Sequence, residues 1–126
     1  MPVTEAAARI MIFLSEDDRH GHRGLHEVIL GRAREDGIAG ATVWRGIEGF
    51  GHSGHIRTSR FPDAATGLPL AVEIFDSPDR IDAFLPVIRE LAPNSLITRE
   101  QVEVTRFSGG QPLALDDPGP ESDHQR

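Results

Sequence analysis

The chain has 126 residues and a formal net charge of -7, from 20 carboxylates and 13 basic residues. This length fits one domain with a single core. Cysteine is absent, which excludes disulfides, thiolate metal sites and cysteine nucleophiles. Every basic residue is an arginine and no basic block is present, so we expect no binding to nucleic acid, which depends on clustered cations.

The N-terminal region shows no sign of membrane insertion. Its apolar run at residues 10–14 is much shorter than the ~20 residues that span a bilayer. We therefore expect a cytoplasmic protein with a flexible N-terminus over residues 1–7 and a folded domain over residues 8–107. The low apolar content of residues 108–126 predicts a disordered tail.

The first predicted elements are a strand and a helix. Residues 8–14 contain a continuous apolar run with two isoleucines, which is typical of a central strand buried on both faces. An acidic and Gly/His-rich loop follows, up to Gly24. Apolar residues then recur at helical spacing before Gly37, which suits a left-handed helix cap; they are Leu25, Val28, Ile29 and Ala33.

Two further strands are predicted in the middle of the chain. Residues 40–45 form a short segment with β-branched and aromatic side chains, bounded by glycine on both sides. This composition favours a strand. Residues 68–75 alternate in the manner of a half-buried strand. An earlier segment, residues 55–60, is a candidate partner for that strand.

The last predicted elements are a helix and a strand. Ser77 can cap exposed backbone amides and Pro78 suits the first helical position. Pro86 lies inside the apolar helical pattern, so we expect a kink or a restart there. Residues 101–107 alternate apolar and polar side chains and predict the final strand.

The element order is strand, helix, strand, strand, helix, strand. This order predicts an α+β, ferredoxin-like βαββαβ fold, with a four-stranded antiparallel sheet and both helices on one face. The strands carry apolar residues on both sides, among them Met11, Phe13, Val43 and Phe75. Because monomers seldom expose large apolar patches, we expect other subunits to cover the second face.

A glycine-rich loop follows the second predicted strand. Gly46, Gly49, Gly51 and Gly54 fall within nine residues, and such loops can bring backbone amides close to an anion. The alternative is a mobile hairpin connection that binds no ligand.

Residues 40–51, together with residues 13–19, 68–70 and 76–78, resemble the PII-like family catalogued as domain of unknown function 190. The resemblance covers residues 8–107. It implies a sensor or adaptor that forms a homotrimer, binds a small ligand such as an adenine nucleotide in clefts between subunits, and regulates a protein partner such as a transporter or channel.

The resemblance places ligand binding in the glycine-rich loop and at its base. The candidate residues are Arg45, Gly46, Glu48, Gly49, Phe50, Gly51 and His52. Arg45 is the first choice for a phosphate or carboxylate partner because its guanidinium binds such groups bidentately; the alternative is a structural ion pair with Glu48 or Glu16. Phe50 is a candidate to stack on a base, to anchor in a partner, or to seat the loop on the sheet.

Two other functional classes remain open. A metal- or ion-responsive protein would use loop histidines, namely His20, His22, His52 and His55, although their spacing matches no zinc pattern. An enzyme would need a nucleophile beside a base, and no spacing provides one. We expect a non-enzymatic protein without a cofactor.

Overall fold

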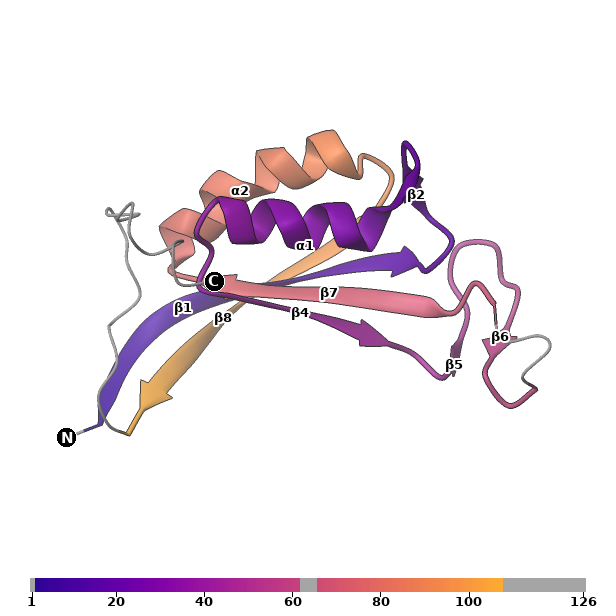
Figure 1. The fold of residues 1–126 in the computed structure, drawn as a ribbon. Coiled ribbons are helices and arrows are strands. Elements are labelled where there is room, and N and C mark those ends of the chain that lie inside the picture. Colours follow the sequence, from indigo (N-terminus) through magenta and orange to yellow (C-terminus); the bar gives the residue numbers. More distant parts are fainter. Residues whose placement is uncertain (1, 62–65, 108–126) are drawn as a thin grey trace.

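The structure, a computed structural model, describes residues 2–61 and 66–107. Its centre is a four-stranded antiparallel sheet in the order β4-β7-β1-β8. Two helices, α1 and α2, cover one face of this sheet (Figure 1). The predicted α+β, ferredoxin-like fold is confirmed. The bounds are Val3–Ser15 for β1, Leu25–Glu35 for α1, Gly40–Arg45 for β4, Pro69–Asp76 for β7, Pro78–Leu91 for α2 and Leu96–Arg106 for β8.

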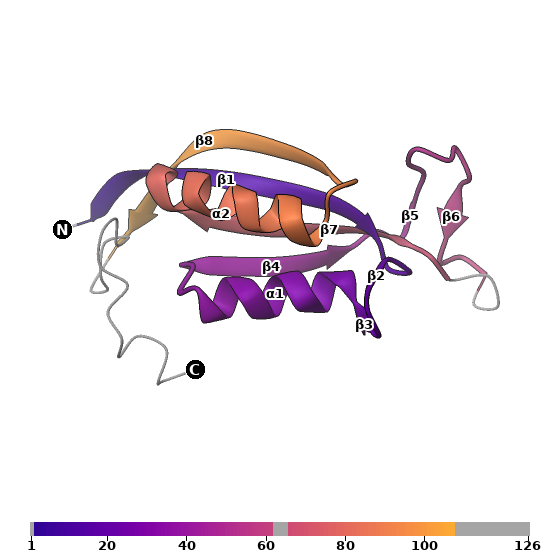
Figure 2. The same cartoon turned by 90° about the horizontal axis from the view of Figure 1, so that it is seen from above.

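The core lies between the sheet and the helices. Alternate residues of a strand point to the same face, and on the helix side β1 contributes Ile10 and Ile12 while β7 contributes Val72 and Ile74, all of them fully buried. Figure 2 shows α1 along β4 and α2 along β1 above this layer. The helices complete the core with buried side chains, among them Ile29, Ala33, Ile81, Phe84 and Ile88.

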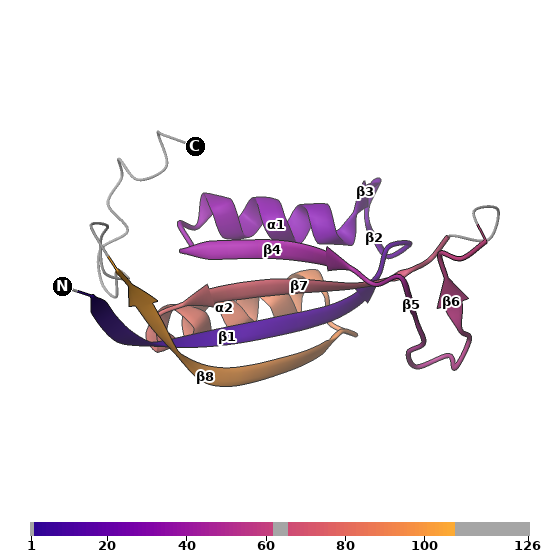
Figure 3. The same ribbon diagram turned by 90° about the horizontal axis from the view of Figure 1, so that it is seen from below.

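The opposite face of the sheet is not covered by the helices, as Figure 3 shows. It carries exposed apolar side chains. Strand register aligns Trp44, Ala71, Phe13 and Leu96 in one row across all four strands. Trp44 is 56% exposed, Phe13 43% and Leu96 68%. The prediction that β1 is buried on both faces is therefore wrong for the single chain, since only the side that faces the helices is covered.

Val43 lies on the helix side, where it packs against the core, so its neighbour Trp44 takes the place on the open face.

Charged side chains occupy the other end of the open face. Arg9 forms ion pairs with Glu73, at 3.3 Å, and with Glu100. The indole Nε1 of Trp44 donates to the second oxygen of Glu73 at 2.8 Å. Hydrogen bonding to Glu100, together with the negative charges of both carboxylates, raises the pKa of Arg9.

The N-terminal boundary differs from the prediction. β1 begins at Val3, and residues 3–7 pair with residues 102–106 of β8. Because β7 pairs with β1 only up to Ala8, the outer parts of β1 and β8 form a two-stranded extension, visible in Figure 3. Residues 3–7 are thus part of the sheet and not a flexible N-terminus.

Other boundaries are refined in smaller ways. β8 begins at Leu96, before the predicted residue 101, and α2 runs through Pro86 as one helix without the predicted restart. The loop before α1 contains two short strands, β2 (Arg19–His20) and β3 (Arg23–Gly24). No described helix has the length and apolar character needed to cross a membrane. The predicted tail, residues 108–126, lies outside the described residues.

Candidate functional site

The glycine-rich segment leaves the sheet after β4 and returns to it at β7. Its described part contains a second small ladder, β5 (Glu48–Gly49) with β6 (Arg57–Thr58). The ladder projects from the end of the sheet (Figures 1 and 2). Residues 55–60 are the candidate partner predicted for β7, but β6 pairs with β5 instead. The two arms therefore form a hairpin.

Gly54 shapes the tip of this hairpin. Its φ is 77°, in the left-handed region that glycine adopts without a steric penalty. The Gly54 N–H donates to the carbonyl of Gly51 at 2.9 Å. On the stem side, the Ser59 N–H donates to the carbonyl of Ile47 at 2.8 Å, which extends the pairing toward the sheet.

Glu16 joins the two ends of the segment. Arg45 Nε donates to Glu16 Oε2 at 3.1 Å and Arg45 Nη2 donates to Oε1 at 3.2 Å, a bidentate ion pair. The Leu68 N–H donates to the same Oε1 at 3.0 Å, and the Glu16 N–H donates to the Leu68 carbonyl at 2.9 Å. The hydrogen bonds from Arg45 and Leu68 lower the pKa of Glu16.

Gly46 allows close contact between the same two ends. Its N–H donates to the Pro69 carbonyl at 2.7 Å. A Cβ at this position would lie 2.9 Å from Pro69 Cγ and 3.2 Å from the Pro69 carbonyl oxygen. The base of the hairpin is thus closed on both sides, by Glu16 and by the contact between Gly46 and Pro69.

Glu48 belongs to the hairpin itself. It forms an ion pair with Arg60, with Arg60 Nε 3.3 Å from Glu48 Oε1, and accepts a hydrogen bond from the Thr58 hydroxyl at 3.3 Å. Of the two ion-pair partners considered for Arg45, the structure shows Glu16. Arg45 therefore pairs with Glu16 at the base of the hairpin, whereas Glu48 pairs with Arg60 across its two arms.

Several apolar side chains of the hairpin are exposed. Phe50 is among them, so it does not seat the hairpin on the sheet within one chain. The set consists of Ile47, Phe50, Ile56 and Phe61. Exposed apolar side chains grouped on one segment are typical of surfaces that contact another molecule.

The histidines considered as metal ligands occupy two separate hairpins. His20 lies in β2 and His22 in the turn between β2 and β3, whereas His52 and His55 lie near the tip of the other hairpin. Within residues 2–61 and 66–107, no group of three or more His, Asp or Glu side chains is placed to hold a metal ion.

His26, beside the first of these hairpins, has a different setting. It lies at the start of α1, and its positive form would lower the pKa of Glu16. Its Nδ1 is enclosed and has no hydrogen-bond partner. The sequence groups His26 with the loop histidines but does not indicate its effect on Glu16. In the structure the Leu25 N–H donates to the Asp18 carbonyl at 2.8 Å, which brings the start of α1 back to the loop that follows β1.

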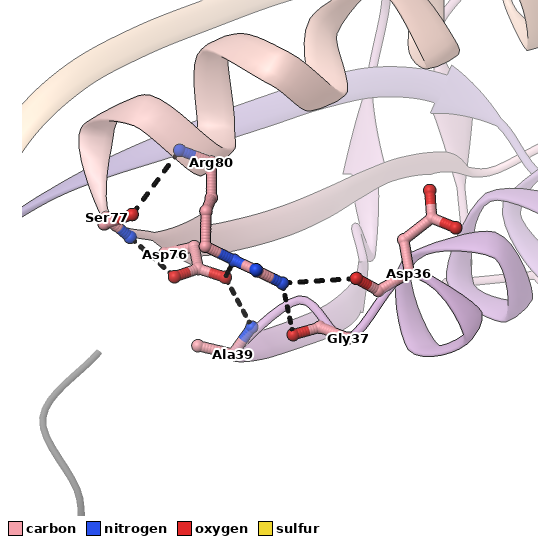
Figure 4. A network of polar contacts seen from close by, with 6 residues as sticks. All are labelled: Asp36, Gly37, Ala39, Asp76, Ser77 and Arg80. Carbon is pink, nitrogen blue, oxygen red and sulfur yellow. Dashed lines mark hydrogen bonds and ion pairs between the residues drawn. The ribbon is translucent and has the colours of Figure 1, made fainter. Parts of the chain in front are cut away.

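A second polar network lies at the far end of the helices (Figure 4). Asp76 is 1% exposed; its carboxylate accepts from Arg80 Nε at 2.9 Å, from the Ala39 N–H at 3.0 Å and from the Ser77 N–H at 2.7 Å. Arg80 Nη2 also donates to the carbonyl of Gly37 at 2.8 Å. Arg80 thus gives the Gly37 carbonyl, just after α1, a hydrogen-bond partner, and the network connects the end of α1 to the start of α2. Its role is structural.

The same network confirms the predicted start of α2. The Ser77 hydroxyl accepts a hydrogen bond from the Arg80 N–H at 3.4 Å, as an N-cap does. The left-handed cap predicted at Gly37 is also present, with a φ of 75°.

Two surface hollows among the described residues lie away from the glycine-rich hairpin. One, of about 420 Å³, lies between α2 and the start of β8, and another, of about 350 Å³, lies between the start of α2 and the outer parts of β1 and β8. Neither of these two hollows is lined by residues 45–52.

The chain has relatives among known proteins. It matches the model of the family DUF190, described as "Uncharacterized ACR, COG1993", over residues 7–104. A UPF0166 protein of Aquifex aeolicus (strain VF5) is 40% identical over 95 residues, covering 75% of this chain and 90% of the relative. A UPF0166 protein of Methanocaldococcus jannaschii is 30% identical over 86 residues, 68% of this chain and 79% of the relative.

Solved structures show the same fold at low sequence identity. CPII of Thiomonas intermedia K12, a nitrogen regulatory PII-like protein solved with ADP, AMP and bicarbonate, matches with a TM-score of 0.58 and 12% identity, over 82% of this chain and 92% of CPII. A putative PII-like signalling protein of Thermus thermophilus matches with a TM-score of 0.55 and 16% identity, over 82% and 91%. The chain has a PII-like fold and belongs to the DUF190 family.

Proposed function

We propose that the protein is a PII-like regulator, not an enzyme, that binds a small anionic ligand, such as an adenine nucleotide, at clefts between the subunits of a homotrimer. The ligand would contact the base and first arm of the hairpin, through Arg45, Gly46, Glu48, Gly49, Phe50, Gly51 and His52. Its binding would set the conformation of the hairpin for a protein partner, such as a transporter or channel. We place this activity in the cytoplasm, where adenine nucleotides are abundant.

The observation that carries the proposal is the position of Arg45. It lies at the base of the projecting hairpin and its side chain is 56% exposed. Its guanidinium can make planar bidentate contacts to a phosphate or carboxylate. Trp44, the preceding residue, lies on the open face of the sheet and is exposed as well. A second subunit on that face would come close to Arg45 and would supply the missing walls of a cleft.

The solved relatives support the choice of ligand. The fold of this chain is that of CPII, which was solved with ADP and AMP. Since proteins of one fold can bind different ligands, the ligand needs a direct test.

The test is calorimetric titration with AMP and ADP, together with thermal unfolding. A ligand that binds only the folded protein raises its stability by mass action, by about 2.7 kcal/mol at a hundredfold excess over Kd. We expect AMP or ADP to bind and Arg45→Ala to weaken binding at least about tenfold, the loss of roughly one charge-assisted contact. Arg99→Ala is the matched control, because Arg99 pairs with the exposed Asp82 away from the hairpin. Absence of binding by both nucleotides would contradict the proposed ligand class.

A further inference from the structure

Glu16 lies where a ligand anion would be expected. One oxygen of its carboxylate receives both Arg45 Nη2, at 3.2 Å, and the Leu68 N–H, at 3.0 Å, while the other receives Arg45 Nε at 3.1 Å. A guanidinium fork combined with a backbone N–H is a common way for a protein to hold a carboxylate or phosphate group. In this structure the group so held belongs to the chain itself.

We propose that the Arg45 guanidinium and the Leu68 N–H form a binding site for a small oxyanion, a carboxylate or a phosphate group, and that Glu16 is an internal competitor for this site. The inference rests on the proposed function in that it assigns the anionic part of the ligand to Arg45. It adds that the ligand must displace Glu16 before it can bind.

Access to the site is unequal for its two donors. The Arg45 side chain is 56% exposed and that of Glu16 is 22% exposed, whereas Leu68 is buried. An incoming anion therefore meets the guanidinium first. Glu16 can leave by rotation of its side chain alone, because its backbone N–H stays bonded to the Leu68 carbonyl.

Charge decides the direction of the effect. A second anion at Arg45 would lie beside the Glu16 carboxylate, and two like charges at such a distance repel each other. The Arg45 side chain is 56% exposed, so solvent screens its attraction to Glu16 and leaves the pair open to competition. Glu16 should thus lower the affinity for an oxyanion without preventing its binding.

Displacement would also act on the hairpin. Glu16 is bonded to Arg45 at the start of the glycine-rich segment and to Leu68 at its end. A ligand held by Arg45 and the Leu68 N–H takes over this link from Glu16, while the contact between Gly46 and Pro69 remains. The two ends of the hairpin are then joined through the ligand, and Glu16 no longer connects them.

The test compares Glu16→Gln with the unchanged chain in calorimetric titrations with AMP and with inorganic phosphate, at one fixed ionic strength. Glutamine keeps the length of the side chain and an oxygen for the Leu68 N–H, but removes the negative charge. We expect Glu16→Gln to bind AMP about two- to fivefold more tightly, the factor that corresponds to an exposed ion pair. Arg45→Gln should weaken binding, and Asp82→Asn, which neutralises a carboxylate of another exposed pair, should leave it unchanged.

Glu16→Asp is a second variant that keeps the net charge. Its carboxylate is one methylene shorter and cannot hold Arg45 and Leu68 in the same geometry, so its affinity for AMP should also rise. If both Glu16 variants bind AMP as the unchanged chain does, or more weakly, Glu16 is not a competitor and the inference is overturned while the proposed function stands. If AMP and phosphate bind to none of these proteins, the inference and the proposed ligand class both fail.

Discussion

Asp76 shows how one buried carboxylate can organise two helices. It is almost fully buried and accepts hydrogen bonds from Arg80, from the Ala39 N–H and from the Ser77 N–H. A buried charge of this kind is tolerated because it is paired and fully hydrogen-bonded. The contacts place the start of α2 against the end of α1, and so hold the sheet and helices in one arrangement.

We predict that Asp76→Ala destabilises the fold by about 3–5 kcal/mol, because it leaves the Arg80 charge and two backbone N–H groups without their acceptor. Chemical denaturation of the two proteins measures this difference. Asp82→Ala removes an exposed carboxylate that is paired with Arg99 and should cost less than about 1 kcal/mol. Equal effects of the two substitutions would show that the buried network does not have the role assigned to it.

Glu16 should make stability depend on pH. Its pKa is lower in the folded chain, chiefly through the hydrogen bond from Arg45, so the unfolded chain binds a proton more readily. The stabilising contribution of Glu16 is therefore present at neutral pH and is lost as the pH falls through the folded pKa. We predict that the unchanged chain is more stable than Glu16→Gln at pH 7 and that this advantage shrinks as the pH falls below about 4.3, the usual pKa of glutamate. A difference that does not change with pH, measured by denaturation across this range, would contradict the assignment.

The role of Arg45 illustrates what sequence can predict at this scale. Arg45 is a candidate because it lies in the segment that resembles the PII-like family and because a guanidinium binds phosphate or carboxylate groups bidentately. Its partner could not be chosen, because Glu48 is near in the chain while Glu16 comes into contact only when β1 and β4 join the same sheet. Asp76 was missed as a buried network residue for the same reason, since several of its contacts come from other elements.

At the scale of elements, β1 is longer than its apolar run. Residues 3–7 pair with residues 102–106 of β8, beyond the point where β7 ends. Thr4 and Thr105 face each other across this ladder with their hydroxyls 3.1 Å apart, and Arg106 pairs with Glu5. Backbone pairing and polar cross-strand contacts hold this part together with little apolar burial.

We predict that removal of residues 1–5 leaves the fold intact but increases amide hydrogen exchange in residues 104–106 of β8, which lose their partners. Exchange in the central part of β1, around Ile10 and Ile12, should stay slow because both residues are in the core. Unchanged exchange at residues 104–106 would indicate that the N-terminal residues do not pair in solution.

Element type was more predictable than element boundaries. β4 matches its predicted range because glycine bounds its β-branched and aromatic residues, and α2 begins where Ser77 and Pro78 indicated. The start of β1 and the pairing of β6 with β5 were not predicted, because both depend on backbone ladders in polar sequence. Pro86 removes only one backbone donor inside α2, and the apolar face that carries Phe84 and Ile88 holds the helix together.

At the scale of the whole molecule, the open face of the sheet is mixed in character. Trp44, Phe13 and Leu96 form an exposed apolar row near the hairpin, while Arg9 with Glu73 and Glu100 forms a charged cluster farther along. An apolar row of this kind would be covered in the proposed homotrimer. Trp44→Glu should weaken that assembly, because it places a charge in the covered row.

In the proposed function, other copies of the chain complete the ligand site. Sedimentation velocity at micromolar protein concentration tests this assembly. We predict one species with three times the 13.8 kDa mass of the chain. A species of single-chain mass that binds AMP would contradict the proposal that the site lies between subunits.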